Sequence, residues 1–369
     1  MKQLIVNRED LKHNINRVQE YTKQISKNKD YTIIAVVKGN GYGLDLKKYT
    51  EILKDNGITY FAVATLEEAL LLRKEEKNIQ ILMLSALNEE SEIEEAIKNN
   101  ITITIDSNEN ASIVNELSKK GYNIKAHIKI DTGFGRYGFL YTDTKSIIQN
   151  VNELRKNNVN IEGIFSHFSC AYYKKNKHTI EQFNNFMNVL KTLKENDIEI
   201  KLQHICNSPA ILNYPEMCLN SARIGSAFTG RVCSENNIGL KKIGQLEISI
   251  AEVRTVPEKF NISYLNSYKT KKETKIAILP TGYIDGYNVT QKTDMFRVRD
   301  KLRRAVHELK SIFKKQKLTA IINEKRYNII GTIRNTIVDV TGSNIKNGEI
   351  AELEVNPLYI DKEIRSEYI

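Results

Sequence analysis

Residues 33–43 of this 369-residue chain place a single lysine where chemistry could occur. Ile33–Val37 is an uninterrupted apolar run, mostly β-branched, which is typical of a strand buried on both faces of a sheet. Lys38 follows directly, so its amine should lie at the mouth of the sheet, where α/β barrels carry out catalysis. Three glycines follow within five residues and leave space around the lysine, while Tyr42 stands among them with few packing partners. A strand end that merely lets a lysine reach solvent is the simpler alternative, but this neighbourhood favours a functional site.

The elements that must position this lysine alternate along the first two thirds of the chain. Between residues 30 and about 228, short apolar runs are separated by stretches such as Leu66–Lys77 and Ile180–Asn196, whose apolar residues recur three and four positions apart. Strands that alternate with helices form parallel sheets, so eight such runs predict an α/β fold, an eight-stranded (β/α)8 barrel of the TIM type. The runs are Ile33–Val37, Tyr60–Ala64, Ile79–Leu84, Ile101–Ile105, Ile124–Ile130, Ile161–Phe165, Lys201–Ile205 and Ser221–Ile224.

Polar and charged residues follow several of these runs. In such a barrel the carboxyl ends of all strands meet at one face, and that face carries the active site. The periodicity alone therefore predicts that residues far apart in the chain come together. They are Lys38 after the first run, Lys129–Arg136 around the fifth, His167 after the sixth, Ser208 after the seventh and Arg223–Ser226 after the eighth.

The character of the sequence changes after about residue 240. Segments such as Gln245–Val256 and Ile350–Val355 are β-branched or alternate, which indicates a mostly β domain. We therefore predict a barrel domain over residues 1–238, including an N-terminal arm, and a C-terminal β domain over residues 239–369. Residues 294–318 contain nine Lys or Arg against three Asp or Glu, with apolar residues at helical spacing. This pattern predicts a basic amphipathic helix inserted in the β domain.

The composition excludes several classes of protein. More than half of the formal net charge of +10 comes from the insertion, and a solvated basic face is its usual explanation, so we expect no nucleic-acid partner. No apolar stretch approaches the ~20 residues that a membrane helix needs, and the first residues lack the pattern of a signal peptide. The four cysteines lack C-x-x-C spacing, which argues against a metal site and fits reduced thiols. We predict a cytoplasmic protein with no metal and no membrane partner.

Six segments, in one order along the chain, resemble motifs of the alanine racemase family, whose members depend on pyridoxal phosphate and have fold type III. The first is similar to the family's V-K-A-N-A-Y-G, with glycines in place of both alanines. The six are V-K-G-N-G-Y-G (37–43), K-I-D-T-G-F-G-R-Y-G (129–138), G-I-F-S-H-F (163–168), N-S (207–208), R-I-G (223–225) and P-T-G-Y-I-D-G-Y (280–287). The resemblance implies an N-terminal barrel, a C-terminal β domain and a homodimer with shared active sites, in which the β domain of one subunit completes the site of the other.

The resemblance also implies roles for the residues that match these motifs. Lys38 would bind pyridoxal 5'-phosphate covalently, and Arg223 would face the pyridine nitrogen. Because arginine does not give up its proton near neutral pH, that nitrogen would stay unprotonated, which suppresses side reactions such as transamination. The implied cofactor-binding set is Lys38, Tyr42, His167, Asn207, Ser208, Arg223, Gly225 and Ser226.

Racemisation needs one group to remove a proton from the substrate Cα and a second to deliver one to the opposite face. By resemblance, the pair is Lys38 and Tyr264 of the partner subunit, which lies in a segment similar to the family's S-Y-G-x-x-Y. His167 and Arg223 would help that tyrosine act as a base, since its ordinary pKa is near 10. The implied substrate-binding set is Arg136, Lys129 (which carries a carbamate in many relatives), Tyr283, Arg334 and Asn335.

The chain departs from the family pattern in two places. The turn at 331–339 is about two residues shorter than the family's C-M-D-Q-x-x-V-D, and residues 294–318 are extra. The insertion and a late asparagine resemble the serine/alanine racemase subgroup. We predict an amino acid isomerase that interconverts L- and D-alanine, which would supply D-alanine for peptidoglycan. The alternatives are a serine racemase, a non-catalytic pyridoxal phosphate carrier, and a decarboxylase of this two-domain fold, which should have an acidic residue instead of Arg223.

Overall fold

Eight parallel strands form a nearly closed barrel in the computed structural model, which describes all residues except 27–30, 235, 290–301, 303–304, 307–308 and 310–317. The strand order is β4-β3-β2-β10-β9-β8-β6-β5, and a bridge between Leu82 and Thr102 brings β4 beside β5. Each strand falls on one of the predicted apolar runs, which confirms the predicted barrel. The strands are β2 Thr32–Val36, β3 Tyr60–Val63, β4 Gln80–Met83, β5 Ile103–Ile105, β6 Lys125–Asp131, β8 Asn160–Phe165, β9 Leu202–Asn207 and β10 Ser221–Ile224.

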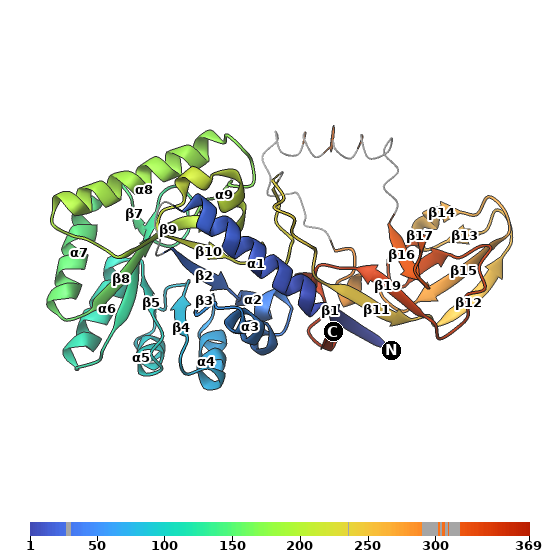
Figure 1. Cartoon of the computed structure of the whole chain (residues 1–369), viewed down its shortest axis with the longest axis horizontal. Coiled ribbons are helices and arrows are strands. Elements are labelled where there is room, and N and C mark those ends of the chain that lie inside the picture. Colours follow the sequence, from blue (N-terminus) through green and yellow to red (C-terminus); the bar gives the residue numbers. More distant parts are fainter. Residues whose placement is uncertain (27–30, 235, 290–301, 303–304, 307–308, 310–317) are drawn as a thin grey trace. The chain divides into compact units, whose positions relative to one another are not determined.

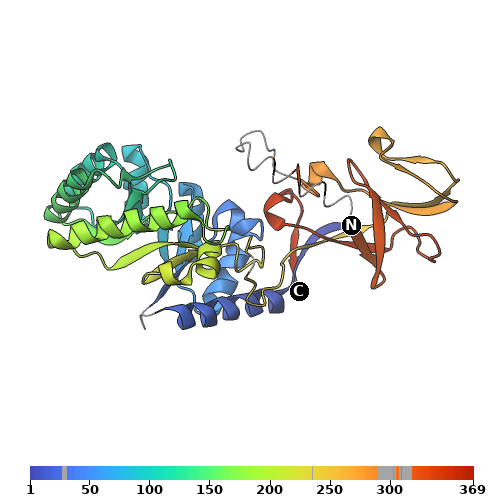
Figure 2. The ribbon, with the colours of Figure 1, turned by 90° about the horizontal axis from the view of Figure 1, so that it is seen from above.

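Helices alternate with these strands and lie around them (Figures 1 and 2). Local signals set several of their starts, because a side-chain oxygen just before the helix accepts an otherwise unpaired backbone N–H. Thr65 serves α4 and Asp143 serves α7 in this way. The helices are α1 Arg8–Ile25, α2 Lys38–Tyr42, α3 Leu46–Asp55, α4 Leu66–Glu75, α5 Glu90–Lys98, α6 Asn108–Lys119, α7 Thr144–Lys156, α8 Lys177–Glu195 and α9 Ser208–Asn213. None of the helices formed by the described residues is long and apolar enough to cross a membrane.

The rest of the chain forms a second unit, mostly of β structure, as predicted. Residues 8–243 make up the barrel unit, and residues 1–7 with 244–369 make up the second one. Its main sheet has the order β12-β15-β18-β17-β16-β19-β11-β1-β20. Its strands are β1 Lys2–Val6, β11 Gln245–Ser249, β12 Glu252–Val256, β15 Thr274–Leu279, β16 Thr319–Ile322, β17 Lys325–Gly331, β18 Thr336–Asp339, β19 Ile350–Glu354 and β20 Ser366–Tyr368, with a separate hairpin of β13 Asn261–Ile262 and β14 Tyr268–Lys269.

Two sequence predictions, the N-terminal arm and the basic insertion, concern residues of this second unit. The N-terminal arm is strand β1, which pairs antiparallel with β11 and parallel with β20 inside the second sheet. The predicted basic helix at 294–318 lies almost entirely outside the described residues.

One buried amide fastens α1 to the barrel unit. The Nδ2 group of Asn14 donates to the carbonyl oxygens of Phe228 at 2.9 Å and Lys241 at 2.7 Å, and its Oδ1 accepts from the backbone N–H of Lys241 at 2.7 Å. The Asn14 side chain is fully buried, and so is its bond to Phe228, while the two bonds to Lys241 are partly buried. The three bonds therefore tie the first helix to the segment that follows the last barrel strand.

Replacing this amide should weaken the barrel unit. Asn14→Ala removes the partner of three backbone groups, one of them the buried carbonyl of Phe228, and we expect it to lower the free energy of unfolding by about 1–3 kcal/mol. The measurement is the midpoint of urea unfolding. Asn16→Ala on the exposed face of the same helix is the matched control and should leave the midpoint nearly unchanged. Equal midpoints for the two variants would contradict the proposed anchoring.

Candidate active site

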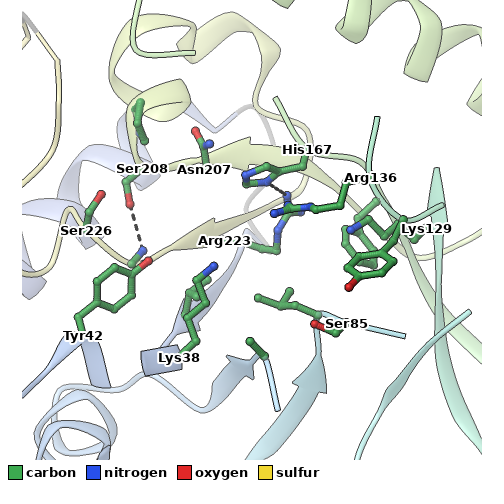
Figure 3. Close-up of a pocket in the computed structure, with 17 residues that line it drawn as sticks. Lys38, Tyr42, Ser85, Lys129, Arg136, His167, Asn207, Ser208, Arg223 and Ser226 are labelled. Carbon is green, nitrogen blue, oxygen red and sulfur yellow. Dashed lines mark hydrogen bonds between the residues drawn. The ribbon is translucent and has the colours of Figure 1, made fainter. Parts of the chain in front are cut away.

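A cavity of about 230 Å³ opens at the carboxyl ends of the barrel strands (Figure 3). Every predicted site residue of the barrel unit lines it. These are Lys38, Tyr42, Lys129, Arg136, His167, Asn207, Ser208, Arg223, Gly225 and Ser226. The remaining predicted residues, Tyr264, Tyr283, Arg334 and Asn335, belong to the second unit, so the barrel cavity by itself does not contain them.

Four cationic side chains are among the described residues that line this cavity, and none of these residues is Asp or Glu. Partial burial and the charge of Arg136 lower the pKa of Lys38, and Arg223 adds to this effect while Glu68 opposes it. Burial and the same two arginines lower the pKa of Lys129 to about 8. Like charges gathered in a partly dry space favour their neutral forms or an anionic ligand. The electrostatics therefore suit a ligand that carries several negative charges.

Arg223 is buried on β10, and acceptors on neighbouring strands fix its guanidinium. Its Nη1 donates to Nδ1 of His204 at 2.5 Å, and its Nη2 donates to the Ser166 carbonyl at 2.6 Å and to Nδ1 of His167 at 3.0 Å. Because arginine only donates, both imidazole nitrogens must accept. Burial, followed by the charge of Arg223, lowers the pKa of both histidines well below the usual range. Arg223 is thus a fixed cation between two neutral imidazoles.

Two further buried residues, His127 and Tyr60, extend this network. Neither His127 nor His204 was identified as a site residue from the sequence. Nε2 of His204 lies 3.0 Å from Nδ1 of His127, and Nε2 of His127 lies 3.0 Å from the hydroxyl oxygen of Tyr60. Since His204 accepts at Nδ1, it donates at Nε2, and His127 then donates to Tyr60. Burial lowers the pKa of His127 to about 3, so it stays neutral. The available signal was the two-residue spacing of His127 and Lys129 in a buried strand, which places both on one face.

Hydroxyl groups gather where β9 and β10 end. The Ser208 hydroxyl oxygen accepts from the backbone N–H groups of Gly225 at 3.0 Å and Ala227 at 3.2 Å, so its own proton remains available for a ligand. Burial raises the pKa of Tyr42 to about 12, so that its hydroxyl stays protonated. A Cβ atom at Gly225 would lie 2.3 Å from the Tyr42 hydroxyl oxygen, and only glycine permits this approach. Asn207 starts α9, where its Oδ1 accepts from the N–H of Ala210 at 3.1 Å.

A carboxylate beneath the loop organises the residues that carry Arg136. The carboxylate of Asp131 accepts from the backbone N–H groups of residues 133, 134, 135 and 136 at 2.9–3.2 Å. The Arg136 guanidinium then stacks 4.3 Å from the centre of the Phe134 ring. These contacts hold a glycine-rich loop in one conformation at the cavity mouth.

Comparison with known proteins agrees with the geometry. Residues 6–232 match the family model "Alanine racemase, N-terminal domain", and residues 243–358 match "Alanine racemase, C-terminal domain". The chain belongs to the alanine racemase family. This confirms the resemblance that the six motifs carried.

Named relatives of the alanine racemase family cover most of the chain. An alanine racemase of Methanococcus maripaludis is 37% identical over 283 residues, 75% of this chain and 74% of the relative. One of Clostridium tetani is 41% identical over 276 residues, 73% of this chain and 70% of the relative. The solved alanine racemase of Clostridium difficile 630 matches all of this chain and 95% of its own with a TM-score of 0.82 at 26% identity. That of a D-cycloserine-producing Streptomyces lavendulae has the same fold at 22% identity.

Replacing one carboxylate oxygen of Asp131 with an amide nitrogen should make the loop at residues 133–136 more mobile. In Asp131→Asn, an amide group faces backbone N–H groups that need an acceptor, and we expect trypsin to cleave after Arg136 about tenfold faster. The measurement is mass spectrometry of a limited digest. Asp143→Asn is the control, because the Asp143 side chain accepts from a single N–H, that of Ser146, at the start of α7. Unchanged cleavage after Arg136 in the Asp131 variant would show that the loop does not depend on this carboxylate.

Proposed function

We propose that this protein is a pyridoxal phosphate-dependent racemase that interconverts L-alanine and D-alanine, supplying the D-isomer for peptidoglycan. The observation that carries the proposal is the barrel cavity, where Lys38 lies among cations and hydroxyl donors, with no carboxylate among the lining residues that the structure describes. Membership of the alanine racemase family supports the same reaction. Figure 3 draws the Lys38 side chain directed into the space beside Tyr42 and Arg223.

The lining residues fit pyridoxal 5'-phosphate on chemical grounds. A phosphate prefers hydroxyl and backbone N–H donors, and Tyr42, Ser208, Ser226 and the turn at Gly225 offer them on one side of the cavity. On another side, Arg223 offers a donor that does not lose its proton, which matches the unprotonated nitrogen of the cofactor ring. Lys38 would hold the cofactor covalently. When bound, pyridoxal phosphate withdraws electrons from the substrate, so that its α-proton becomes removable.

Two residues of this chain would move the proton at the substrate Cα. Lys38 has a pKa lowered by burial and by Arg136, so its amine is more readily neutral than an ordinary lysine and can accept a proton. Tyr264 of the partner subunit would serve the opposite face. Its position in η2 (Tyr264–Asn266) leaves it 61% exposed in the isolated chain, which suits a group that acts on another subunit.

Substrate binding would rest on charge at the cavity mouth. The guanidinium of Arg136 would bind the substrate carboxylate as a bidentate pair. Lys129 would support it from β6, the strand that leads into the loop of Arg136, and the partner subunit would contribute Tyr283, Arg334 and Asn335. Together these groups would orient an α-amino acid in front of Lys38.

A homodimer is part of this proposal. In the second unit, Leu265 is 96% exposed and Ile284 is 76% exposed, next to the predicted site residues Tyr264 and Tyr283. Large apolar side chains gathered beside polar site residues mark interaction surfaces. A second copy of the chain would cover them and complete the active site.

The direct test is chiral chromatography of reactions that contain the purified protein, pyridoxal phosphate and either L-alanine or L-serine. We expect D-alanine to form faster than D-serine. Tyr264→Phe should reduce racemisation at least about a hundredfold, because general acid–base groups contribute factors of that order. Tyr327→Phe, on β17 of the same unit, should leave the rate unchanged.

The outcomes separate the alternatives. Faster formation of D-serine than of D-alanine would support the proposed mechanism but identify serine as the preferred substrate. Absorbance of bound cofactor without racemisation of either amino acid would contradict the enzyme assignment and favour a pyridoxal phosphate carrier.

Lys129 has the chemistry for reversible modification by carbon dioxide, which reacts with a neutral amine. With a pKa of about 8, roughly a tenth of its amine is neutral at pH 7, far more than for an ordinary lysine. At a fixed carbon dioxide pressure, we expect the carbamate on Lys129 to increase as the pH rises through 8. The measurement is carbon-13 NMR with labelled carbon dioxide, and Lys129→Arg should remove the signal. A carbamate signal that persists in this variant would contradict the assignment to Lys129.

A further inference from the structure

Glu68 has a role that its local sequence does not explain. Thr65-Leu66-Glu67-Glu68 reads as a capping box, in which the glutamate should accept from the N–H of the threonine that starts the helix. Only half of that box forms, since the Thr65 hydroxyl accepts from the N–H of Glu68 at 3.3 Å. The carboxylate of Glu68 turns elsewhere. Its Oε1 accepts from the N–H groups of Gly39 at 2.7 Å and Asn40 at 3.1 Å, and its Oε2 accepts from that of Ala64 at 3.2 Å.

The segment that Glu68 holds has an unusual backbone. Residues 39–43 have φ angles of 66°, 55°, 67°, 58° and 80°, so five consecutive residues are left-handed. L-amino acids disfavour this conformation, and here it includes Asn40 and the bulky Tyr42. Such a turn persists only where its surroundings determine it. Glu68 binds its first two N–H groups, and Oδ1 of Asn40 accepts from the N–H of Leu46 at 3.0 Å.

Lys38 is the residue directly before this turn, so the turn sets where its side chain starts. The charged groups that act on Lys38 come from three elements: Arg136 from the loop after β6, Arg223 from β10 and Glu68 from α4. The two arginines lower the pKa of Lys38, and Glu68 is the single acid that raises it among these described groups. His167 and Lys129, which line the same cavity, bring no negative charge.

We propose that Glu68 is a positioning residue for Lys38: its carboxylate holds the left-handed turn that follows β2 and supplies the negative charge beside the lysine. The assignment rests on the proposed function, since it concerns the lysine that would carry the cofactor. It predicts two separable effects. The hydrogen bonds keep Lys38 in place, and the charge sets the pH at which its amine becomes free to react.

The experiment uses the full-length protein and pyridoxal phosphate in the absence of alanine. Absorbance follows cofactor attachment over a range of pH and cofactor loss after dilution, and borohydride reduction with peptide mapping confirms attachment at Lys38. Glu68→Gln keeps one acceptor oxygen and removes the charge. We expect its attachment profile to move to lower pH and its cofactor to be lost about fivefold faster. A purely structural role would leave the pH profile in place.

Glu67→Gln is the matched control, because it removes a charge from the neighbouring, exposed position of the same helical turn. It should change neither measurement. Glu68→Asp keeps the charge but shortens the reach, so it should retain the wild-type pH profile while losing the cofactor faster. If Glu68→Gln does not fold, the test rests on Glu68→Asp. Cofactor loss at the wild-type rate in Glu68→Asp would overturn the proposal.

Two results would contradict the positioning role directly. They are a wild-type pH profile in Glu68→Gln and an equal shift in Glu67→Gln. Failure of the proposed function gives a different result, namely attachment at Lys38 without any racemisation, which leaves the comparison of the Glu68 variants intact.

Discussion

Four cationic side chains repel one another in one small cavity at the carboxyl ends of the barrel strands. The surrounding residues must hold these cations in place against that repulsion. No carboxylate is present among the described lining residues, and three of the four cations depend on neutral acceptors or on an acid outside the lining. Arg223 uses imidazole nitrogens and the carbonyl of Ser166, and Arg136 lies on a loop whose backbone N–H groups bind Asp131. For Lys38 the acid is Glu68, whose carboxylate accepts from the backbone N–H of the next residue, Gly39. Because the compensation lies behind the cations, their charge stays directed at the ligand.

The imidazoles behind Arg223 suit this task because they are neutral. A carboxylate in that place would form an ion pair with the guanidinium and weaken its field in the cavity. His204 and His127 instead accept and pass on hydrogen bonds toward Tyr60, all in one direction. Burial keeps them uncharged, so the network orients the arginine without cancelling its charge.

The sequence predicts the barrel well because the strands coincide with short apolar runs and the motif residues of the barrel lie at or near the ends of these runs. Its limits have physical causes. Strand β1 pairs with β11 across 240 to 246 positions of the chain, and no local pattern indicates such a contact. His127 and His204 were missed because the hydrogen-bond partners of a buried histidine lie far away in the sequence and can be identified only in the folded structure. Glu68 was hidden by a capping box, a local signal whose acid is diverted to the turn at residue 39.

The protonation states of the lining groups bear on the proposed two-base reaction. A second proton-transfer group must face Lys38 across the substrate, and the described lining offers four titratable candidates apart from the arginines. His167 accepts from Arg223 and is held neutral, and the Tyr42 hydroxyl is too weak an acid to ionise readily. The Nζ atom of Lys129 lies 5.4 Å from the centre of the Tyr137 ring, so these two side chains form a cation–π contact with each other. In the proposed function this second group is Tyr264 of the partner subunit, so the proposed homodimer would supply what the barrel lining lacks.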